Sequence, residues 1–297
     1  ASAEALCRLA EQEHRLARTH HDGQRYDMAV ERYLEVIQRY DRNDARHLIA
    51  RPWVRRAMRG FADAQAECRQ FREARGVYLH YISGADPDDA DLPEVFFRAA
   101  EASRELAAEA KRQGRPDPHA LDRATELLQN LLTRFASRPD AQAVVVRSRL
   151  ALGRLLFERE DYRGAKTYLA EHLRLGSDGG DQVRFLLAEC NFHHARALRA
   201  EGLHVEADVH LQEAIALYER LSERSRQGAL DPLADPGAYR RAAFRIGECH
   251  LALSTPDYVR ALFSFLQAQQ RHREEEIPAE VLVHIARCYS ELQAHDA

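Results

Sequence analysis

The sequence of 297 residues is poor in lysine and tryptophan and has no long apolar run. Lys111 and Lys166 are its only lysines, so arginine supplies nearly all of the positive charge, which is typical of a GC-rich bacterial coding sequence. The formal net charge is −4, and nucleic-acid-binding proteins usually carry a basic surface that contacts phosphates. We therefore expect no nucleic-acid partner. Because no run of about 18 apolar residues exists, we also expect no membrane-spanning helix.

Cysteine is sparse and unevenly placed. An odd number of widely separated cysteines fits neither a small disulfide scaffold nor a CxxC zinc site. We therefore expect reduced thiols and, on that ground, a cytoplasmic location. A periplasmic or envelope-associated location is the alternative if an N-terminal signal or anchor was removed, although residues 1–10 do not form a signal peptide. The cysteines are Cys7, Cys68, Cys190, Cys249 and Cys288.

Motifs for catalysis, phosphate binding and metal binding are missing. The sequence contains no GxSxG, no glycine-rich phosphate loop and no HExxH. The pairs His20-His21 and His193-His194 are poor metal ligands, because neighbouring residues on a helix point about 100° apart. We predict no catalytic residues, no cofactor, no metal and no enzymatic activity.

A repeated helical pattern occupies most of the chain. In residues 146–175, one amphipathic segment carries the pair Leu152-Gly153, and a second carries Tyr162, Ala165 and Leu169. Small residues at Gly153 and Ala165 would let two antiparallel helices approach closely while large neighbours fill the surrounding space. The pattern predicts a helical hairpin, whose first helix we call helix A and whose second we call helix B.

The helix B signature recurs five more times as an alanine with a large residue four positions later and an apolar or small residue after seven. A large residue also lies three positions before each alanine, as Tyr162 does before Ala165. The recurrences are Ala29/Tyr33/Val36, Ala74/Tyr78/Tyr81, Ala124/Leu128/Leu131, Ala214/Tyr218/Leu221 and Ala261/Phe265/Ala268.

Large-small pairs precede these segments, as expected for helix A. Three cysteines follow the small residue by two positions, which indicates one repeated structural position. The pairs are Leu16-Ala17, Phe61-Ala62, Ala99-Ala100, Leu187-Ala188 and Ile246-Gly247, and Ile285-Ala286 is a further pair with no helix B after it.

This pattern resembles the tetratricopeptide repeat (TPR) family, in an irregular bacterial type with long repeats. The resemblance implies an all-α, right-handed solenoid of about six antiparallel helical hairpins with a C-terminal capping helix, whose outer face we expect to be polar. We predict one continuous domain over residues 1–297, with hairpins at approximately 3–40, 52–83, 93–136, 140–175, 180–225 and 236–271 and the capping helix at 278–293.

The repeats are longer than the family's usual length of about 34 residues. In the third and fifth hairpins, the distance from the small residue of helix A to the alanine of helix B is about twice that in residues 146–175. Sharing the added residues between two helices predicts about two extra turns in each.

The resemblance places a partner-binding groove along the A helices, where this family binds extended peptides or helices. Phenylalanines in such a groove would be anchors with a large contact area, and charged residues would select the partner. The alternative is that these rings pack between neighbouring A helices. The residues at the family's groove positions are Arg147, Arg154, Phe157, Phe185, Glu189, Phe192, Arg241, Phe244 and Glu248.

These observations favour a non-enzymatic adaptor or scaffold that binds a protein, as a peptide segment or subunit, in a multiprotein bacterial assembly. The first alternative is a structural subunit that uses its edges and faces, or an envelope-associated assembly factor. The second is a small-ligand sensor or enzyme scaffold, for which His14, Arg18 and His21 are the candidate pocket residues.

Overall fold

The computed structural model describes residues 2–40, 50–115, 117–175, 180–231, 235–270 and 277–295, and the regular structure in these ranges is helical. Arg271, the expected end of the sixth hairpin, lies outside them. The α-helices are α1 (Ala3–His20), α2 (Gly23–Tyr40), α3 (Arg51–Glu67), α4 (Phe71–Gly84), α5 (Leu92–Arg112), α6 (Pro118–Phe135), α7 (Gln142–Glu158), α8 (Tyr162–Arg174), α9 (Gly180–Ala200), α10 (His204–Arg226), α11 (Pro236–Ala252), α12 (Tyr258–Gln269) and α13 (Ala279–His295).

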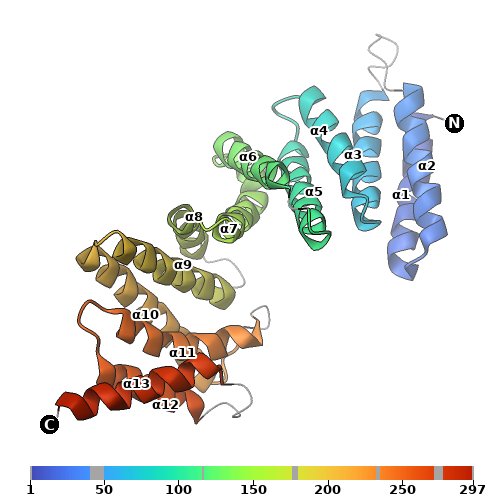
Figure 1. Ribbon diagram of the computed structural model, residues 1–297. Coiled ribbons are helices and arrows are strands. Elements are labelled where there is room, and N and C mark those ends of the chain that lie inside the picture. The colour runs from blue at the N-terminus through green and yellow to red at the C-terminus, as the bar shows by residue number, and fades with distance from the viewer. Residues whose placement is uncertain are drawn as a thin grey trace. The chain divides into compact units, whose positions relative to one another are not determined.

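The helices pair in chain order as antiparallel hairpins (Figure 1). Each odd-numbered helix from α1 to α11 is a helix A, the next helix is its helix B, and α13 follows the sixth hairpin. The predicted all-α architecture of TPR-like hairpins with a terminal helix is therefore confirmed. The handedness of a solenoid stays a prediction.

The chain divides into two compact units, residues 1–148 and 149–297. The N-terminal unit contains α1 to α6, and each of these helices packs against the next one in sequence. The C-terminal unit contains α8 to α13, which pack in the same sequential way. The boundary falls within α7, and a single continuous array over residues 1–297 stays a prediction.

The repeated alanines and large residues form the interior of the hairpins. The six helix B alanines are at most 1% exposed, and the large residues four positions later are at most 3% exposed. The alanines are Ala29, Ala74, Ala124, Ala165, Ala214 and Ala261, and the large residues are Tyr33, Tyr78, Leu128, Leu169, Tyr218 and Phe265. The predicted stripe is thus the core of each hairpin.

The small residue of helix A lies directly against the large residue of helix B. A Cβ atom added to Gly153 would lie 2.7 Å from a side-chain carbon of Leu169, and one added to Gly247 would lie 2.6 Å from the ring of Phe265. Non-bonded carbon atoms do not approach so closely, so an alanine at either position would displace the facing side chain, and glycine is favoured at these two helix crossings.

Aspartates begin several of the B helices. The side chains of Asp117, Asp161 and Asp257 accept hydrogen bonds from backbone N–H groups in the first turns of α6, α8 and α12. These caps satisfy donors that have no partner within the helix. They define where these three B helices start, and so which of their residues face helix A.

The long hairpins are present, but their extra length is shared unevenly. Helix α7 has 17 residues and α8 has 13, whereas α9 has 21 and α10 has 23. Helix A of the fifth hairpin therefore gains about one turn and helix B nearly three, rather than two in each. The added length carries α9 beyond the usual end of a helix A.

The three cysteines at the repeated position are buried and free. Cys190, Cys249 and Cys288 have no exposed surface and form no disulfide. Burial raises the pKa of the Cys190 thiol to about 12. They act as small apolar residues in the core, as the spacing predicted.

Substitution of two glycines tests the helix crossing. Gly247→Ala should lower the free energy of unfolding by about 1–3 kcal/mol, because the new methyl group overlaps the Phe265 ring. Gly76, in the interior of α4, has no atom within 4 Å of an added Cβ. Gly76→Ala should therefore raise that free energy by about 0.5–1 kcal/mol through helix propensity. Urea denaturation followed by circular dichroism measures both, and equal effects of the two substitutions would contradict the close crossing.

Candidate functional site

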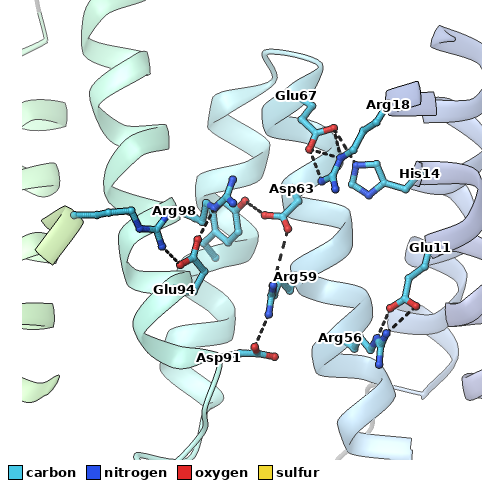
Figure 2. A network of polar contacts seen from close by, with 12 residues as sticks. Glu11, His14, Arg18, Arg56, Arg59, Asp63, Glu67, Asp91, Glu94 and Arg98 are labelled. Carbon is cyan, nitrogen blue, oxygen red and sulfur yellow. Dashed lines mark hydrogen bonds and ion pairs between the residues drawn. The ribbon is translucent and has the colours of Figure 1, made fainter. Parts of the chain in front are cut away.

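The A helices of the N-terminal unit present a groove with nearly balanced charge. It has a volume of about 550 Å³ and is lined from α1, α3 and the start of α5 by four arginines and three carboxylates. Figure 2 shows charged side chains of neighbouring helices pointing toward one another in this region. The lining residues are Glu11, His14, Arg15, Arg18, Tyr33, Arg56, Arg59, Gly60, Asp63 and Asp91.

Glu67, beside this groove on α3, accepts hydrogen bonds from three side chains. His14 Nε2 lies 3.1 Å from the carboxylate, Arg18 Nε lies 2.9 Å away, and the Tyr26 hydroxyl donates at 2.9 Å. Burial alone would raise the pKa of Glu67, but the bonds from His14, Arg18 and Tyr26 lower it to about 2. Glu67 therefore stays ionised and ties α3 to both helices of the first hairpin.

Further ion pairs continue across the same unit. Arg56 of α3 pairs with Glu11 of α1, and Arg59 pairs with Asp91 at the start of α5 (Figure 2). These pairs connect successive A helices. Most of the charged side chains of the groove therefore pair with other side chains of the protein. The N-terminal groove is therefore chiefly a set of internal ion pairs.

The candidate small-ligand pocket in this unit is only partly assembled. His14 and Arg18 both line the N-terminal groove, where they converge on Glu67. His21 is exposed at the C-cap of α1, where its φ of 52° lies in the left-handed region. The structure therefore brings two of the three predicted residues together and separates the third.

The A helices of the C-terminal unit form a groove with a different charge balance, which we call the arginine groove. It has a volume of about 470 Å³, and four arginines but a single carboxylate line it. It lies among α9, α11 and α13. Its lining residues are Phe192, Arg196, Arg199, Arg245, Glu248, Leu251, Ala252, His284 and Arg287.

Arg245 is the fixed cation of the arginine groove. Its Nε donates to Glu189 at 3.0 Å, and its guanidinium also pairs with Glu248. Tyr218 of α10 donates a hydrogen bond to the same Glu189 carboxylate. Burial would raise the pKa of Glu189, but His193, Arg245 and Tyr218 lower it to about 2. Glu189 is therefore a buried anion that orients Arg245.

The Phe192 ring forms the floor of the groove. It is 5% exposed, and the guanidinium carbons of Arg245 and Arg196 lie 4.6 and 5.9 Å from the ring centre. Arginine over an aromatic face gains cation–π stabilisation. Phe192 thus supports two of the arginines that face the groove.

Two arginines of the groove keep their charge available. Arg196 and Arg287 are exposed, and neither has a carboxylate partner among the described residues. Arg199, by contrast, donates to the backbone carbonyl of Ala252. An exposed guanidinium presents several N–H donors that match the two oxygens of a carboxylate.

The groove residues predicted from the sequence are only partly brought together. Phe192 and Glu248 line the arginine groove, and Glu189 lies beneath it. Phe185 is 5% exposed and packs under Arg241, whose guanidinium carbon is 5.0 Å from its ring. In these positions the rings support arginines, and direct contact with a partner stays a prediction.

The remaining predicted residues lie elsewhere. Phe244 is 3% exposed in the core that α11 shares with α12 and α13. Phe157 is half-buried and contacts Tyr162, and Arg154 is exposed on α7. Arg147 belongs to the N-terminal unit, where it pairs with Glu94.

The structure adds residues that the sequence analysis missed. Arg196 and Arg199 follow Phe192 along the same face of α9, beyond the last groove position of a repeat of standard length. Continuing the helical period along the extended α9 would have found them. Arg245 and Arg287 were missed for another reason: they face the groove because of the local rotation of α11 and α13, which follows from packing.

The described ranges contain neither a metal-binding cluster nor a membrane-spanning helix. Within them, no group of three or more His, Cys, Asp or Glu side chains is placed to hold a metal ion. No helix of the described residues is both long and apolar enough to cross a membrane.

Comparison with known proteins yields structural similarity without a sequence match. No protein-family model matches the sequence, and no curated protein matches it. The chain is similar to the crystal structure of BtubC from P. vanneervenii, with 17% identity over 91% of each chain and a TM-score of 0.45. It is also similar to a tetratricopeptide repeat protein from Parabacteroides merdae, with 14% identity, coverage of 93% of this chain and 98% of that chain, and a TM-score of 0.45. The TPR protein TTC0263 from Thermus thermophilus shows 16% identity, coverage of 82% and 99%, and a TM-score of 0.42.

A pH-dependent loss of stability tests the buried anion. The pKa of Glu189 is lower in the folded protein than its ordinary value of 4.5, so its pairing stabilises the fold above that pH and is lost as the pH falls toward about 2. Glu189→Gln should lower the free energy of unfolding at pH 7 by about 2–3 kcal/mol. The difference from the unsubstituted protein should shrink as the pH falls below about 4.5.

Urea denaturation at a series of pH values measures this difference. Glu201 is an exposed glutamate at the end of the same hairpin's first helix, and Glu201→Gln should change the free energy of unfolding by less than about 0.5 kcal/mol. A Glu189→Gln effect that stays constant down to low pH would show that the carboxylate is not paired as described.

Proposed function

We propose that this chain is a non-enzymatic protein-interaction scaffold whose C-terminal unit binds an acidic segment of another protein in the arginine groove. Arrays of stacked helical hairpins commonly use the surface formed by their A helices for binding. The arginine groove lies on that surface, and its lining is strongly cationic. Binding of a segment within a multiprotein bacterial assembly is the role that these features support.

The observation that carries the proposal is the unpaired charge of Arg196 and Arg287. In the N-terminal groove, the arginines at the equivalent surface pair mostly with carboxylates of the protein. The arginine groove has one lining carboxylate, Glu248, and Arg245 already pairs with it. Carboxylates of a partner would supply the missing counter-charges.

The groove also has a preorganised part. Glu189 and the Phe192 ring hold Arg245, so this guanidinium loses little freedom when a ligand arrives. Leu251 and Ala252 add apolar surface beside the charges. A volume of about 470 Å³ accommodates a few side chains of an extended segment rather than a folded domain. We therefore propose an acidic peptide with one or two small apolar residues as the ligand class.

Charge reversal in the groove tests this function. We expect a fluorescein-labelled octapeptide of glutamates to bind the full chain, as measured by fluorescence anisotropy. Arg196→Glu/Arg287→Glu should weaken this binding by about tenfold or more, because two attractive contacts become repulsive. Raising the salt concentration from about 50 to about 300 mM should weaken binding to the unsubstituted protein, because salt screens the charges.

A matched double variant controls for net charge. Arg163 on α8 and Arg220 on α10 are exposed and lie on B helices, so Arg163→Glu/Arg220→Glu makes the same change in charge away from the groove. Its binding should stay within about twofold of the unsubstituted protein, which fits the small energies of exposed charges. Equal weakening by both double variants, or no binding by any protein, would reject the arginine groove as the site.

A further inference from the structure

The loop between α4 and α5 is the most acidic stretch of the described residues. Its residues 86–91, which we call the acidic loop, read DPDDAD and include no basic residue. Asp86, Pro87, Asp88 and Ala90 are exposed. The acidic loop therefore presents carboxylates beside small apolar side chains, which is the composition that the arginine groove calls for in a ligand.

Two aspartates of the acidic loop are used to hold it on the protein. Asp89 Oδ2 accepts hydrogen bonds from Arg55 at 3.1 Å and from the Tyr81 hydroxyl at 2.9 Å. Asp91 pairs with Arg59 of α3 (Figure 2). These contacts fix the end of the loop that leads into α5, and their charge is balanced within the protein.

Hydrogen bonds to the backbone set the shape of the loop tip. The Asp88 N–H group donates to Asp86 Oδ1 at 3.2 Å, and the Asp89 N–H group donates to the Asp86 carbonyl at 3.0 Å. Arg138 donates to the carbonyl oxygens of Pro87 and Asp89, both at 3.4 Å. A segment that is already held in one conformation loses little freedom when it binds.

Asp86 and Asp88 carry the charge that the loop does not neutralise. Both are exposed, and neither has an ion-pair partner among the described residues. The arginine groove has the opposite imbalance, because Arg196 and Arg287 have no carboxylate partner there. The chain thus holds two unpaired carboxylates on a preformed loop and two unpaired guanidinium groups in a groove.

We propose that the acidic loop of one copy of this chain binds in the arginine groove of a second copy. Asp86 and Asp88 supply the counter-charges that the exposed arginines of the groove lack. Pro87, between the two aspartates, lies against the apolar part of the groove. This inference rests on the proposed function of the arginine groove, and it names the chain itself as the partner.

Other exposed carboxylates of the described residues fit the groove less well. Many lie on helices and pair with an arginine of the next turn, as Glu171 does with Arg174 and Glu223 with Arg226. A helix with its side chains is also about 10 Å wide, whereas the groove has a volume of about 470 Å³. The tip of a loop enters such a groove more readily than the side of a helix does.

The contact joins two different surfaces, so it is heterologous. Each copy keeps a free loop or a free groove after one contact forms, and further copies can add until a ring closes. A loop tip buries less than the roughly 1,200 Å² of a standard interface. We therefore expect reversible self-association that appears at high protein concentration and low salt.

Exchange of charge between the two surfaces tests the contact. In sedimentation velocity, the unsubstituted chain should pass from monomer to larger species as its concentration rises from about 10 to about 500 μM. Asp86→Arg/Asp88→Arg should stay monomeric, because loop and groove are then both positive. Arg196→Glu/Arg287→Glu should also stay monomeric, because both are then negative. An equimolar mixture of the two variants should associate, since the loop of each meets an oppositely charged groove on the other.

A matched variant controls for net charge. Asp27 and Glu31 are exposed on α2 rather than in the acidic loop, so Asp27→Arg/Glu31→Arg makes the same change in charge as Asp86→Arg/Asp88→Arg. Its self-association should stay within about twofold of the unsubstituted chain. Equal loss in both double variants would assign the effect to net charge and overturn the proposal, as would a mixture of the two charge-exchanged variants that stays monomeric.

The glutamate octapeptide separates this inference from the function on which it rests. It should bind Asp86→Arg/Asp88→Arg, whose groove is intact, and it should dissociate the self-associated chain by competing with the loop. A chain that binds the octapeptide but stays monomeric at every concentration would overturn the inference and leave the groove's function standing. A chain that neither binds the octapeptide nor associates would overturn both.

Discussion

The contact between a small residue on helix A and a large residue on helix B is the constraint on which each hairpin depends. Where the small residue is Gly153 or Gly247, even one added carbon would overlap the facing side chain. The close crossing aligns the alanine stripe of helix B with helix A and buries both. It also decides which residues remain on the outer side of helix A, and those residues form the grooves.

Charge is distributed differently on the A helices of the two units. In the N-terminal unit, carboxylates such as Glu67 and Glu11 form ion pairs with arginines of the neighbouring A helix, and these pairs hold the A helices together. In the C-terminal unit, one buried carboxylate, Glu189, holds Arg245, while neighbouring arginines stay exposed. The same type of helix thus gives a structural ion-pair surface in one unit and a candidate binding surface in the other, because the numbers of carboxylates differ.

Much of the fold could be predicted from the sequence, while the candidate site could be predicted only in part. Ala165 and Leu169 identify a helix B, since their spacing repeats with the period of a helix and small residues are needed at close crossings. Arg196 was missed because the usual repeat length was applied to α9, which runs further. Arg245 could not be assigned, because neighbouring positions on α11 differ by about 100° and only packing chooses between them. Phe244 was predicted in the groove and lies in the core for the same reason.

Helix α13 shows both what the sequence could predict and what it could not. Ile285-Ala286 identified a seventh helix A from the sequence. That Val281 and Cys288 face inward while Leu282 and Tyr289 face outward, where a polar face was expected, depends on how α13 docks on α12. The sequence by itself determined the helices, their pairing and the small-on-large crossings, because these depend on local periodicity and on residue size. Only the tertiary structure decided which arginines face a groove and which apolar residues stay uncovered, because the rotation of each helix is set by its neighbours.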